Sequence, residues 1–182
     1  MTMRRMAAVA VLIMGAALPA HADPAVDMFS GFQSKSKDPI QVDAQALETY
    51  EDGDQRVSVF SGGVTVTRGK TLMKAGTIKL YSAGGDAAAA PSANANAFTR
   101  IEASGKIFVS SGDQTVTGST AVVDMKANTI TVDGDVVLSQ GANVITGNRL
   151  VVNLTTGRAR VEQAPGKQIR GVFSPGSAAP GQ

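Results

Sequence analysis

The stretch Gly134–Leu154, GDVVLSQGANVITGNRLVVNL, repeats the stretch Gly105–Met125, GKIFVSSGDQTVTGSTAVVDM, which begins 29 residues upstream. Aligning residues 104–132 with 133–161 gives eight identities, and apolar residues recur at the same positions in both copies. The identical pairs include three pairs of glycines: Gly105 with Gly134, Gly112 with Gly141, and Gly118 with Gly147. A fixed period of this size predicts stacked units, each of which covers the apolar face of its neighbour.

A weaker third copy begins at Gly62, 43 residues before Gly105. The additional 14 residues are close to the length of a low-complexity segment, SAGGDAAAAPSANANA, at Ser82–Ala97. We interpret this segment as a loop inserted into the first copy, because Gly84, Gly85 and Pro91 bracket its four alanines. Residues 40–50 provide a weaker capping strand in this scheme.

The segments after residue 22 have the pattern of β-strands. They alternate apolar and polar residues, are rich in Val, Ile and Thr, and are bounded by Gly, Asn and Asp. No stretch after residue 22 sustains a helical period with caps. We therefore predict an all-β domain of antiparallel repeated hairpins at 39–173, without helix outside the signal segment. Residues 23–38 are expected to be a flexible lead, 82–97 a loop and 174–182 a disordered tail.

The first 22 residues have the features of a secretory signal peptide. Arg4 and Arg5 precede an apolar run from Met6 to Leu18, and Ala20-His21-Ala22 supplies the small residues of a cleavage site. The apolar run is short for a membrane span, so we expect cleavage before Asp23. An uncleaved N-terminal anchor is the alternative.

Charge and composition exclude several classes of function. The chain has 17 Lys and Arg against 15 Asp and Glu, and removal of Arg4 and Arg5 with the signal leaves a formal charge of zero. Nucleic-acid binding through bulk positive charge is therefore not expected. The mature chain has no Cys, Trp or His, since His21 is the only histidine. We expect no Cys or His metal site, no His-dependent nucleophile, no cofactor and no enzymatic activity.

Alignment of the copies places apolar side chains in rows on one face of the sheet, because side chains alternate across a strand. The rows either form an ordinary packed core or line a trough that is incompletely filled. With six Phe, two Tyr and no Trp, their mostly aliphatic composition favours a trough, which is typical of a lipid site. The candidate groove-lining residues are Phe60, Val64, Val66, Met73, Ile78, Leu80, Ile101, Ile107, Val109, Val116, Val123, Met125, Ile130, Val132, Val136, Leu138, Ile145, Leu150, Val152 and Leu154.

Three other patterns suggest chemistry but are better explained by structure. Five residues separate Gly63 from Gly69 in GVTVTRGKT, whereas a P-loop needs four, and no helix follows. The Asp-Gly pairs in Glu51–Asp54 and Asp133–Asp135 lack calcium-loop spacing, so we expect hairpin turns at both. Lys70 is interpreted as a turn residue. Scattered basic residues are interpreted as solvated charges, some of which could meet phosphates at the groove rim: Lys35, Lys37, Arg68, Arg149, Arg158 and Arg160.

The run VSVFSGGVTVTRGKTLMKAGTIKLYS at residues 57–82, together with the two later copies and the signal, resembles the LptA (OstA-like) periplasmic proteins of lipopolysaccharide transport. The strongest part is the F-x-G-x-V-x-V-x-x-G pattern at Phe60–Gly69, and the similarity extends over Pro39–Val172. The Ala- and Asn-rich loop and the Pro- and Gly-rich tail depart from the family pattern.

The resemblance implies an open, V-shaped β-jellyroll with an apolar interior that holds the acyl chains of lipid A. It also implies a periplasmic bridge that carries lipopolysaccharide from the inner to the outer membrane for outer-membrane assembly. Its terminal edge strands would stack head to tail with other copies and with membrane partners of the same fold. Two alternatives remain open: a membrane-anchored LptC-like subunit of the same pathway, and a ligand-free structural β-solenoid.

Overall fold

The computed structural model describes residues 29, 38–83 and 98–174 of the chain. The predicted signal peptide, most of the predicted lead, residues 84–97 of the loop predicted at 82–97, and the tail from residue 175 lie outside the described residues. Residues 82 and 83, which the prediction placed in the loop, are the end of a strand. These described residues form ten strands: β1 (Ile40–Asp43), β2 (Ala46–Asp52), β3 (Gln55–Arg68), β4 (Thr71–Ala83), β5 (Phe98–Ser111), β6 (Gln114–Asp124), β7 (Thr129–Gln140), β8 (Asn143–Asn153), β9 (Ala159–Glu162) and β10 (Arg170–Val172).

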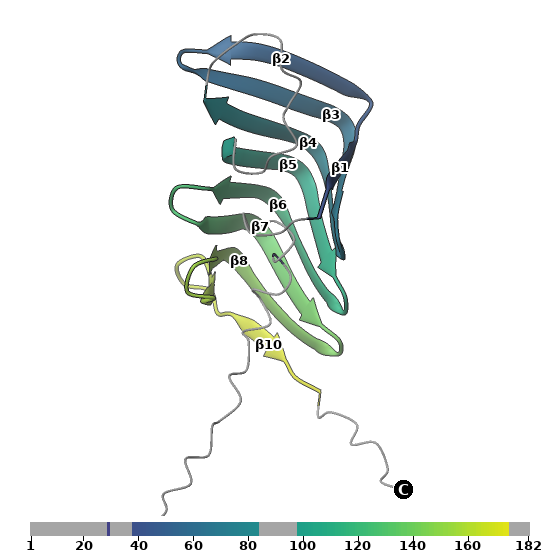
Figure 1. Cartoon of the computed structure of the whole chain (residues 1–182). Coiled ribbons are helices and arrows are strands. Elements are labelled where there is room, and N and C mark those ends of the chain that lie inside the picture. The colour runs from purple at the N-terminus through teal and green to yellow at the C-terminus, as the bar shows by residue number, and fades with distance from the viewer. Residues whose placement is uncertain (1–28, 30–37, 84–97, 175–182) are drawn as a thin grey trace, which may run out of the picture.

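All ten strands form one antiparallel sheet that does not close on itself (Figure 1). Strands β3 to β8 pair consecutively. At one end of this series both β1 and β2 pair with β3, and at the other end both β9 and β10 pair with β8. The predicted all-β, antiparallel fold is confirmed. The part of the chain that the structure describes contains no helix that is long and apolar enough to cross a membrane.

The repeated glycines bend the long strands. The pairing of β3, β5 and β7 shifts register at Ser61/Val64, Ser104/Ile107 and Asp133/Val136, respectively. At these bulges the backbone takes positive φ angles, which glycine adopts without steric cost: +85° and +83° at Gly62 and Gly63, +81° at Gly105, and +83° at Gly134. Since the bulges align across the sheet, every long strand turns at the same level.

The bend divides the sheet into two arms that give it a V shape. The first arm contains β2, β9 and the Gln55–Ser61 half of β3, and the second arm contains β1, β10 and the Val64–Arg68 half of β3. Apolar side chains of both arms face each other and form the core cluster. The outer face carries ion pairs such as Arg100–Glu102 and Arg149–Asp133.

The two Asp-Gly predictions have different outcomes. Gly53 and Asp54 form the turn between β2 and β3, as predicted for Glu51–Asp54. The prediction of a hairpin at Asp133–Asp135 is wrong, because β7 runs through these residues and remains paired with β8 on both sides of them. An Asp-Gly hairpin turn requires positive φ angles. Gly134 and Asp135 (+45°) do have positive φ angles, but they form a β-bulge within the strand instead of a turn.

Candidate functional site

The inner face of the first arm consists of apolar side chains aligned strand by strand. One row runs through Phe60, Ile78, Ala103, Ala121, Val132 and Leu150, each the Cα partner of the next. A second row, two residues further along each strand, runs through Leu80, Ile101, Val123, Ile130 and Val152. The period-2 geometry of strands keeps both rows on the same face.

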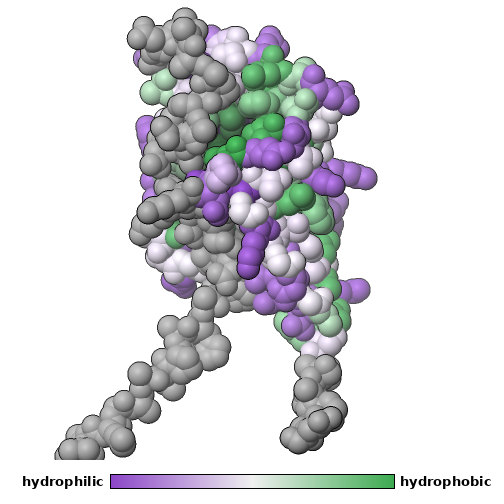
Figure 2. Space-filling model, turned by 45° about the vertical axis from the view of Figure 1, so that its right-hand side comes forward, coloured by the Kyte–Doolittle hydropathy of each residue, from purple (hydrophilic) through white to green (hydrophobic). Residues whose placement is uncertain are grey.

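The second arm presents a facing row of similar character. It runs through Val42, Val66, Met73, Val109, Val116, Leu138 and Ile145. The two arms thus place hydrocarbon opposite hydrocarbon along the interior of the V. In the space-filling view, hydrophobic side chains gather in the upper part of the molecule, with hydrophilic ones beside them (Figure 2).

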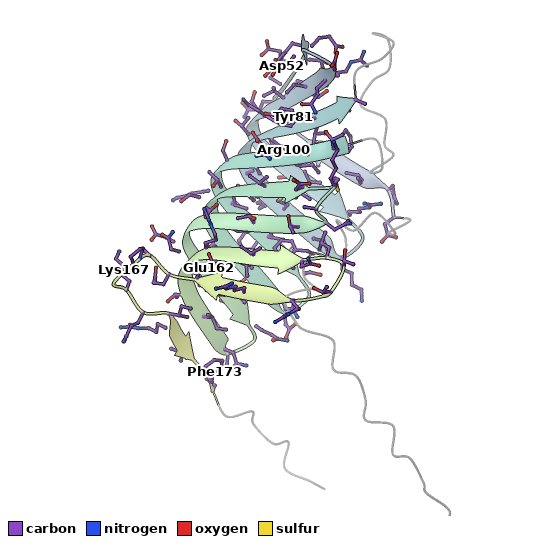
Figure 3. The ribbon with its side chains drawn as sticks, turned by 90° about the vertical axis from the view of Figure 1, so that its left-hand side faces the viewer. Asp52, Tyr81, Arg100, Glu162, Lys167 and Phe173 are labelled. Carbon is purple, nitrogen blue, oxygen red and sulfur yellow. The ribbon has the colours of Figure 1, made fainter. Side chains whose placement is uncertain are left out.

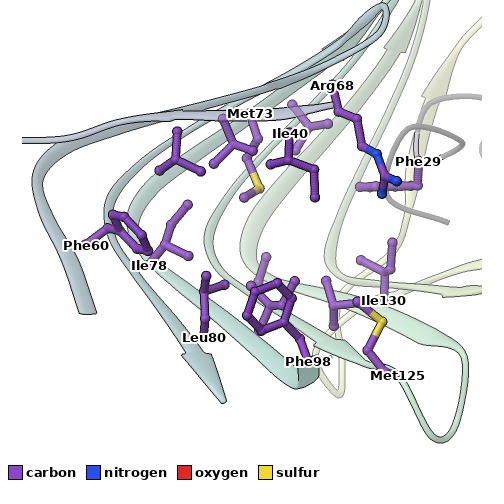
Figure 4. Close-up of a pocket in the computed structure, with 16 residues that line it drawn as sticks. Phe29, Ile40, Phe60, Arg68, Met73, Ile78, Leu80, Phe98, Met125 and Ile130 are labelled. Carbon is purple, nitrogen blue, oxygen red and sulfur yellow. The ribbon is translucent and has the colours of Figure 1, made fainter. Parts of the chain in front are cut away.

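An apolar cavity of about 70 Å³ lies between the arms at the N-terminal part of the sheet. Its walls are Phe29, Ile40, Val42, Phe60, Val66, Arg68, Met73, Ile78, Leu80, Phe98, Ile101, Val109, Ala121, Val123, Met125 and Ile130. Figure 4 shows Phe60, Ile78 and Leu80 on one side and Ile40 and Met73 on the other, with their side chains directed into the space between. Every lining residue except Arg68 is apolar, so the cavity offers an environment for hydrocarbon.

The predicted groove residues separate into two groups. Ten of the twenty line the cavity: Phe60, Val66, Met73, Ile78, Leu80, Ile101, Val109, Val123, Met125 and Ile130. Nine others belong to the same core cluster or pack against it without lining the cavity: Val64, Ile107, Val116, Val132, Val136, Leu138, Leu150, Val152 and Leu154. Ile145 is half-buried and pairs with Leu138 and Gly171.

Six cavity residues were not among the predicted ones: Phe29, Ile40, Val42, Arg68, Phe98 and Ala121. Ile40 and Val42 lie on β1, whose pairing with the second arm has no counterpart in the repeat. Phe29 is only 3% exposed, although it precedes the repeats and lies in the segment predicted to be a lead. Of these six residues, only Ala121 could have been found from the repeat alignment, because it occupies the same position as Leu150 in the next copy.

The prediction that Arg68 is a solvated charge is wrong. Its side chain is 5% exposed and forms part of the cavity wall. Its Nε atom donates a hydrogen bond to the backbone carbonyl of Asp38 at 3.0 Å. Alternation along β3 directs it inward with Val64 and Val66, and this alternation overrides the tendency of Arg to face water.

Two carboxylates on the strands, Glu102 and Asp124, have structural roles. Glu102 accepts a hydrogen bond from Arg100 at 2.7 Å and another from the hydroxyl of Tyr81 at 3.1 Å. Burial, followed by this bond to Glu102, raises the pKa of Tyr81. Asp124 accepts backbone N–H bonds from Lys126 and Ala127 in the turn after β6. The described residues contain no group of three or more His, Cys, Asp or Glu side chains placed to hold a metal ion.

Comparisons with known proteins agree with this architecture. Residues 41–158 match the family described as LptA/(LptD N-terminal domain) LPS transport protein. An uncharacterized protein of Rhizobium meliloti (strain 1021) is 37% identical over 132 residues, covering 70% of this chain and 68% of the relative.

A solved structure shows the same fold. It is LptH of Pseudomonas aeruginosa, described as the LptA-homologous periplasmic component of the lipopolysaccharide transport device. The match has a TM-score of 0.58 at 20% identity and covers 79% of this chain and all of LptH. Because the family match spans more than half of the sequence, the chain belongs to the family of LptA and the LptD N-terminal domain, the lipopolysaccharide transport proteins.

Proposed function

We propose that this protein is a periplasmic carrier that holds the acyl chains of lipopolysaccharide between its two arms during transport from the inner to the outer membrane. The observation that carries the proposal is the cavity between the arms, lined by fifteen apolar residues and Arg68. Membership of the transport family supports it.

The energetics of hydrocarbon in water explain why such a carrier is needed. Burying one methylene group contributes about 0.8 kcal/mol. A chain of about a dozen carbons therefore loses roughly 10 kcal/mol of stabilisation when it is exposed to water. Aligned apolar rows that continue from strand to strand offer equivalent contacts at successive positions along the sheet. A chain can move between such positions without full exposure.

Binding requires the cavity to widen. A volume of about 70 Å³ is smaller than the cavity of about 150 Å³ that holds one benzene molecule in an engineered protein core, and it is therefore less than an acyl chain needs. The V is open along one side, and the arms are joined through the bends of the long strands, through residues 44–45 between β1 and β2, and through residues 163–169 between β9 and β10. We therefore expect the arms to separate when lipid enters.

Site-specific photo-crosslinking tests the assignment of the inner face. A photoreactive amino acid at Val123, which lines the cavity, should capture lipopolysaccharide. The matched control is the preceding residue on the same strand, Val122, whose side chain points to the outer face. Capture at Val122 but not at Val123 would contradict the proposal.

The ends of the sheet are suited to strand addition. Strands β2 and β10 lie at opposite ends of the molecule, and Figure 3 shows Asp52 and Phe173 near these ends. Large apolar side chains are exposed at both: Leu47 and Tyr50 on β2, and Ile169, Val172 and Phe173 at β10. Backbone pairing between edge strands needs little side-chain specificity, so it can join copies of this chain or partners of the same fold.

Concentration-dependent sedimentation tests this end-to-end association. Replacing Leu47 or Val172 with Lys places a charge at one end, which should shift the protein towards monomer. The control is Lys at Val122, away from both edge strands. An unchanged distribution in both end variants would contradict association through these edges.

Export and anchoring are tested separately. N-terminal sequencing of the exported protein should begin at Asp23, whereas an intact Met1 would support the membrane-anchored alternative.

The packed part of the core favours one other candidate, a ligand-free β-solenoid. Val132, Leu150 and Val152 are 0% exposed, so the interior near β8 is closed by its own side chains. Mass spectrometry of the purified protein separates the two functions. Lipopolysaccharide that co-purifies with the protein supports the carrier. If no lipopolysaccharide is bound even after the protein is incubated with it, the scaffold is supported.

A further inference from the structure

One residue in the wall of the cavity between the arms does not belong to the sheet. Fourteen of the sixteen lining residues lie on β1 and on β3 to β7. Met125 directly follows β6, and its backbone N–H donates a hydrogen bond to the carbonyl oxygen of Thr99 at 3.1 Å. The remaining residue, Phe29, lies in a turn eleven positions before β1 begins at Ile40. Figure 4 shows its side chain at the end of the cavity opposite Phe60.

Phe29 is nevertheless as buried as the interior of the sheet. It is 3% exposed and belongs to the same core cluster as Ile78 and Val109. A phenyl ring is hydrocarbon, so it gains from this burial for the same reason that an acyl chain would. Phe29 therefore occupies space in which the proposed function places lipid.

The strand residues of the wall are held by the backbone, whereas Phe29 is not part of any strand pairing among the described residues. Ile78, for example, is paired with Phe60 on one side and with Ala103 on the other. Moving such a residue breaks backbone hydrogen bonds as well as side-chain contacts. Because Phe29 lies outside the ten strands, its departure leaves their pairing intact.

The chain is long enough for Phe29 to leave the interior. Eleven positions separate it from Ile40, and eleven residues span roughly 35–40 Å when they are extended. Phe29 can therefore move from the cavity into water while β1 remains paired with β3.

Departure of the ring would supply space that the cavity lacks. The cavity measures about 70 Å³, whereas one benzene molecule needs about 150 Å³ in an engineered protein core. Removal of the phenyl ring thus opens a space larger than the present cavity. Displacement of Phe29 adds room for an acyl chain beyond what separation of the arms provides.

We propose that Phe29 is an internal plug of the lipid site, which fills one end of the cavity in the lipid-free protein and moves into water when an acyl chain enters. The inference rests on the proposed function and adds to it a competition between lipid and a side chain of the protein itself. A site that its own side chain occupies binds lipid more weakly, by a factor equal to the fraction of molecules in which the site is vacant. This weakening is suited to a carrier that has to release its cargo.

A tryptophan in place of Phe29 tests the proposal directly. The chain has no Trp, so Phe29→Trp introduces a single indole, whose emission moves to longer wavelength when the ring passes from apolar surroundings into water. Saturating tetradecanoic acid, added to the full mature chain, should produce this shift. The matched control is Phe98→Trp, because β5 holds that wall residue through its pairing with Ser82, and its emission should not move to longer wavelength. Unchanged emission of Phe29→Trp, or a shift to shorter wavelength, overturns the proposal.

Truncation of the side chain gives a second readout. Phe29→Ala should bind tetradecanoic acid about tenfold more tightly than the wild type, as expected if the site is vacant in about a tenth of the wild-type molecules. Displacement of a fluorescent fatty acid measures the change. Phe98→Ala removes an equal ring from the part of the wall that the sheet holds, and it should not tighten binding. Unchanged or weaker binding by Phe29→Ala would make Phe29 an ordinary wall residue and overturns the proposal.

Lipopolysaccharide binding, measured in parallel, separates the inference from the function on which it rests. If the wild-type protein binds lipopolysaccharide but either Phe29 variant behaves as a wall residue, the inference alone fails. If neither the wild-type protein nor Phe29→Ala binds lipopolysaccharide or tetradecanoic acid, the proposed function fails.

Discussion

Two copies of the repeat have similar sequences but different interiors. Residues 104–132 contribute Val109, Ala121, Val123, Met125 and Ile130 to the cavity, whereas residues 133–161 contribute none. One pair of equivalent positions differs strongly in side-chain volume: Ala121 in residues 104–132 corresponds to Leu150 in residues 133–161, and Leu150 is 0% exposed. The repeat therefore sets the direction of each side chain, and its size determines whether space remains between the arms.

The largest expected effect is a loss of stability when a cavity is created in residues 133–161, the copy whose interior is filled. Leu150→Ala removes a fully buried side chain from the first arm and should lower the free energy of unfolding by about 2–5 kcal/mol. Denaturant unfolding monitored by circular dichroism measures the loss. A loss well under about 1 kcal/mol would mean that the interior near β8 collapses around the gap, and it would weaken the contrast between the copies.

The next effect comes from the glycines opposite the bulges. A Cβ atom at Gly147 would meet Cγ1 of Val161 and lie 2.9 Å from the carbonyl oxygen of Glu162. Gly147→Ala should therefore cost about 1–3 kcal/mol through overpacking. The equivalent Gly118→Ala should behave alike, because its Cβ would lie 2.5 Å from Cγ1 of Val132.

A double mutant tests the cause of that cost. Adding Val161→Ala to Gly147→Ala removes the clashing methyl groups, so the two changes together should destabilise less than the sum of the single changes. Simple additivity would indicate that the backbone, not Val161, opposes the new side chain.

Filling the cavity next to residues 104–132 with a larger side chain should affect lipid binding more than folding. Ala121→Leu directs three more carbons into the cavity and should weaken lipid binding about tenfold, as expected if roughly two methylenes lose their burial at about 0.8 kcal/mol each. Displacement of a fluorescent fatty acid measures the change, with Val122→Leu as the outward-facing control. Equal effects of the two variants would place the lipid elsewhere.

The smallest effect is expected on the outer face. Arg149 carries a guanidinium, which stays charged in proteins, and the hydrogen bond to Asp133 raises its pKa further. Arg149→Gln removes an exposed ion pair and should leave the melting temperature and lipid binding nearly unchanged. A clear loss of lipid binding in this variant would show that the outer face takes part.

Features that repeat along the chain were predictable, and features that depend on distant contacts were not. The aligned apolar positions identified ten cavity residues because alternation and period are properties of consecutive residues. Phe29, Ile40 and Val42 enter the cavity from outside the repeats, and nothing local to them indicates that contact. Asp133–Asp135 shows the limit for turns, since the same positive-φ residues serve a hairpin or a bulge and only pairing on both sides distinguishes them.

The sequence by itself determined an antiparallel sheet with one apolar face, because the 29-residue period and the alternation of side chains leave few other arrangements. Only the tertiary structure decided where the sheet bends, which part of the interior stays open, and that Arg68 and Gln114 are buried beside the apolar interior. The physical reason is that empty volume and burial depend on how two arms far apart in sequence pack against each other, and this depends on the sizes of facing side chains.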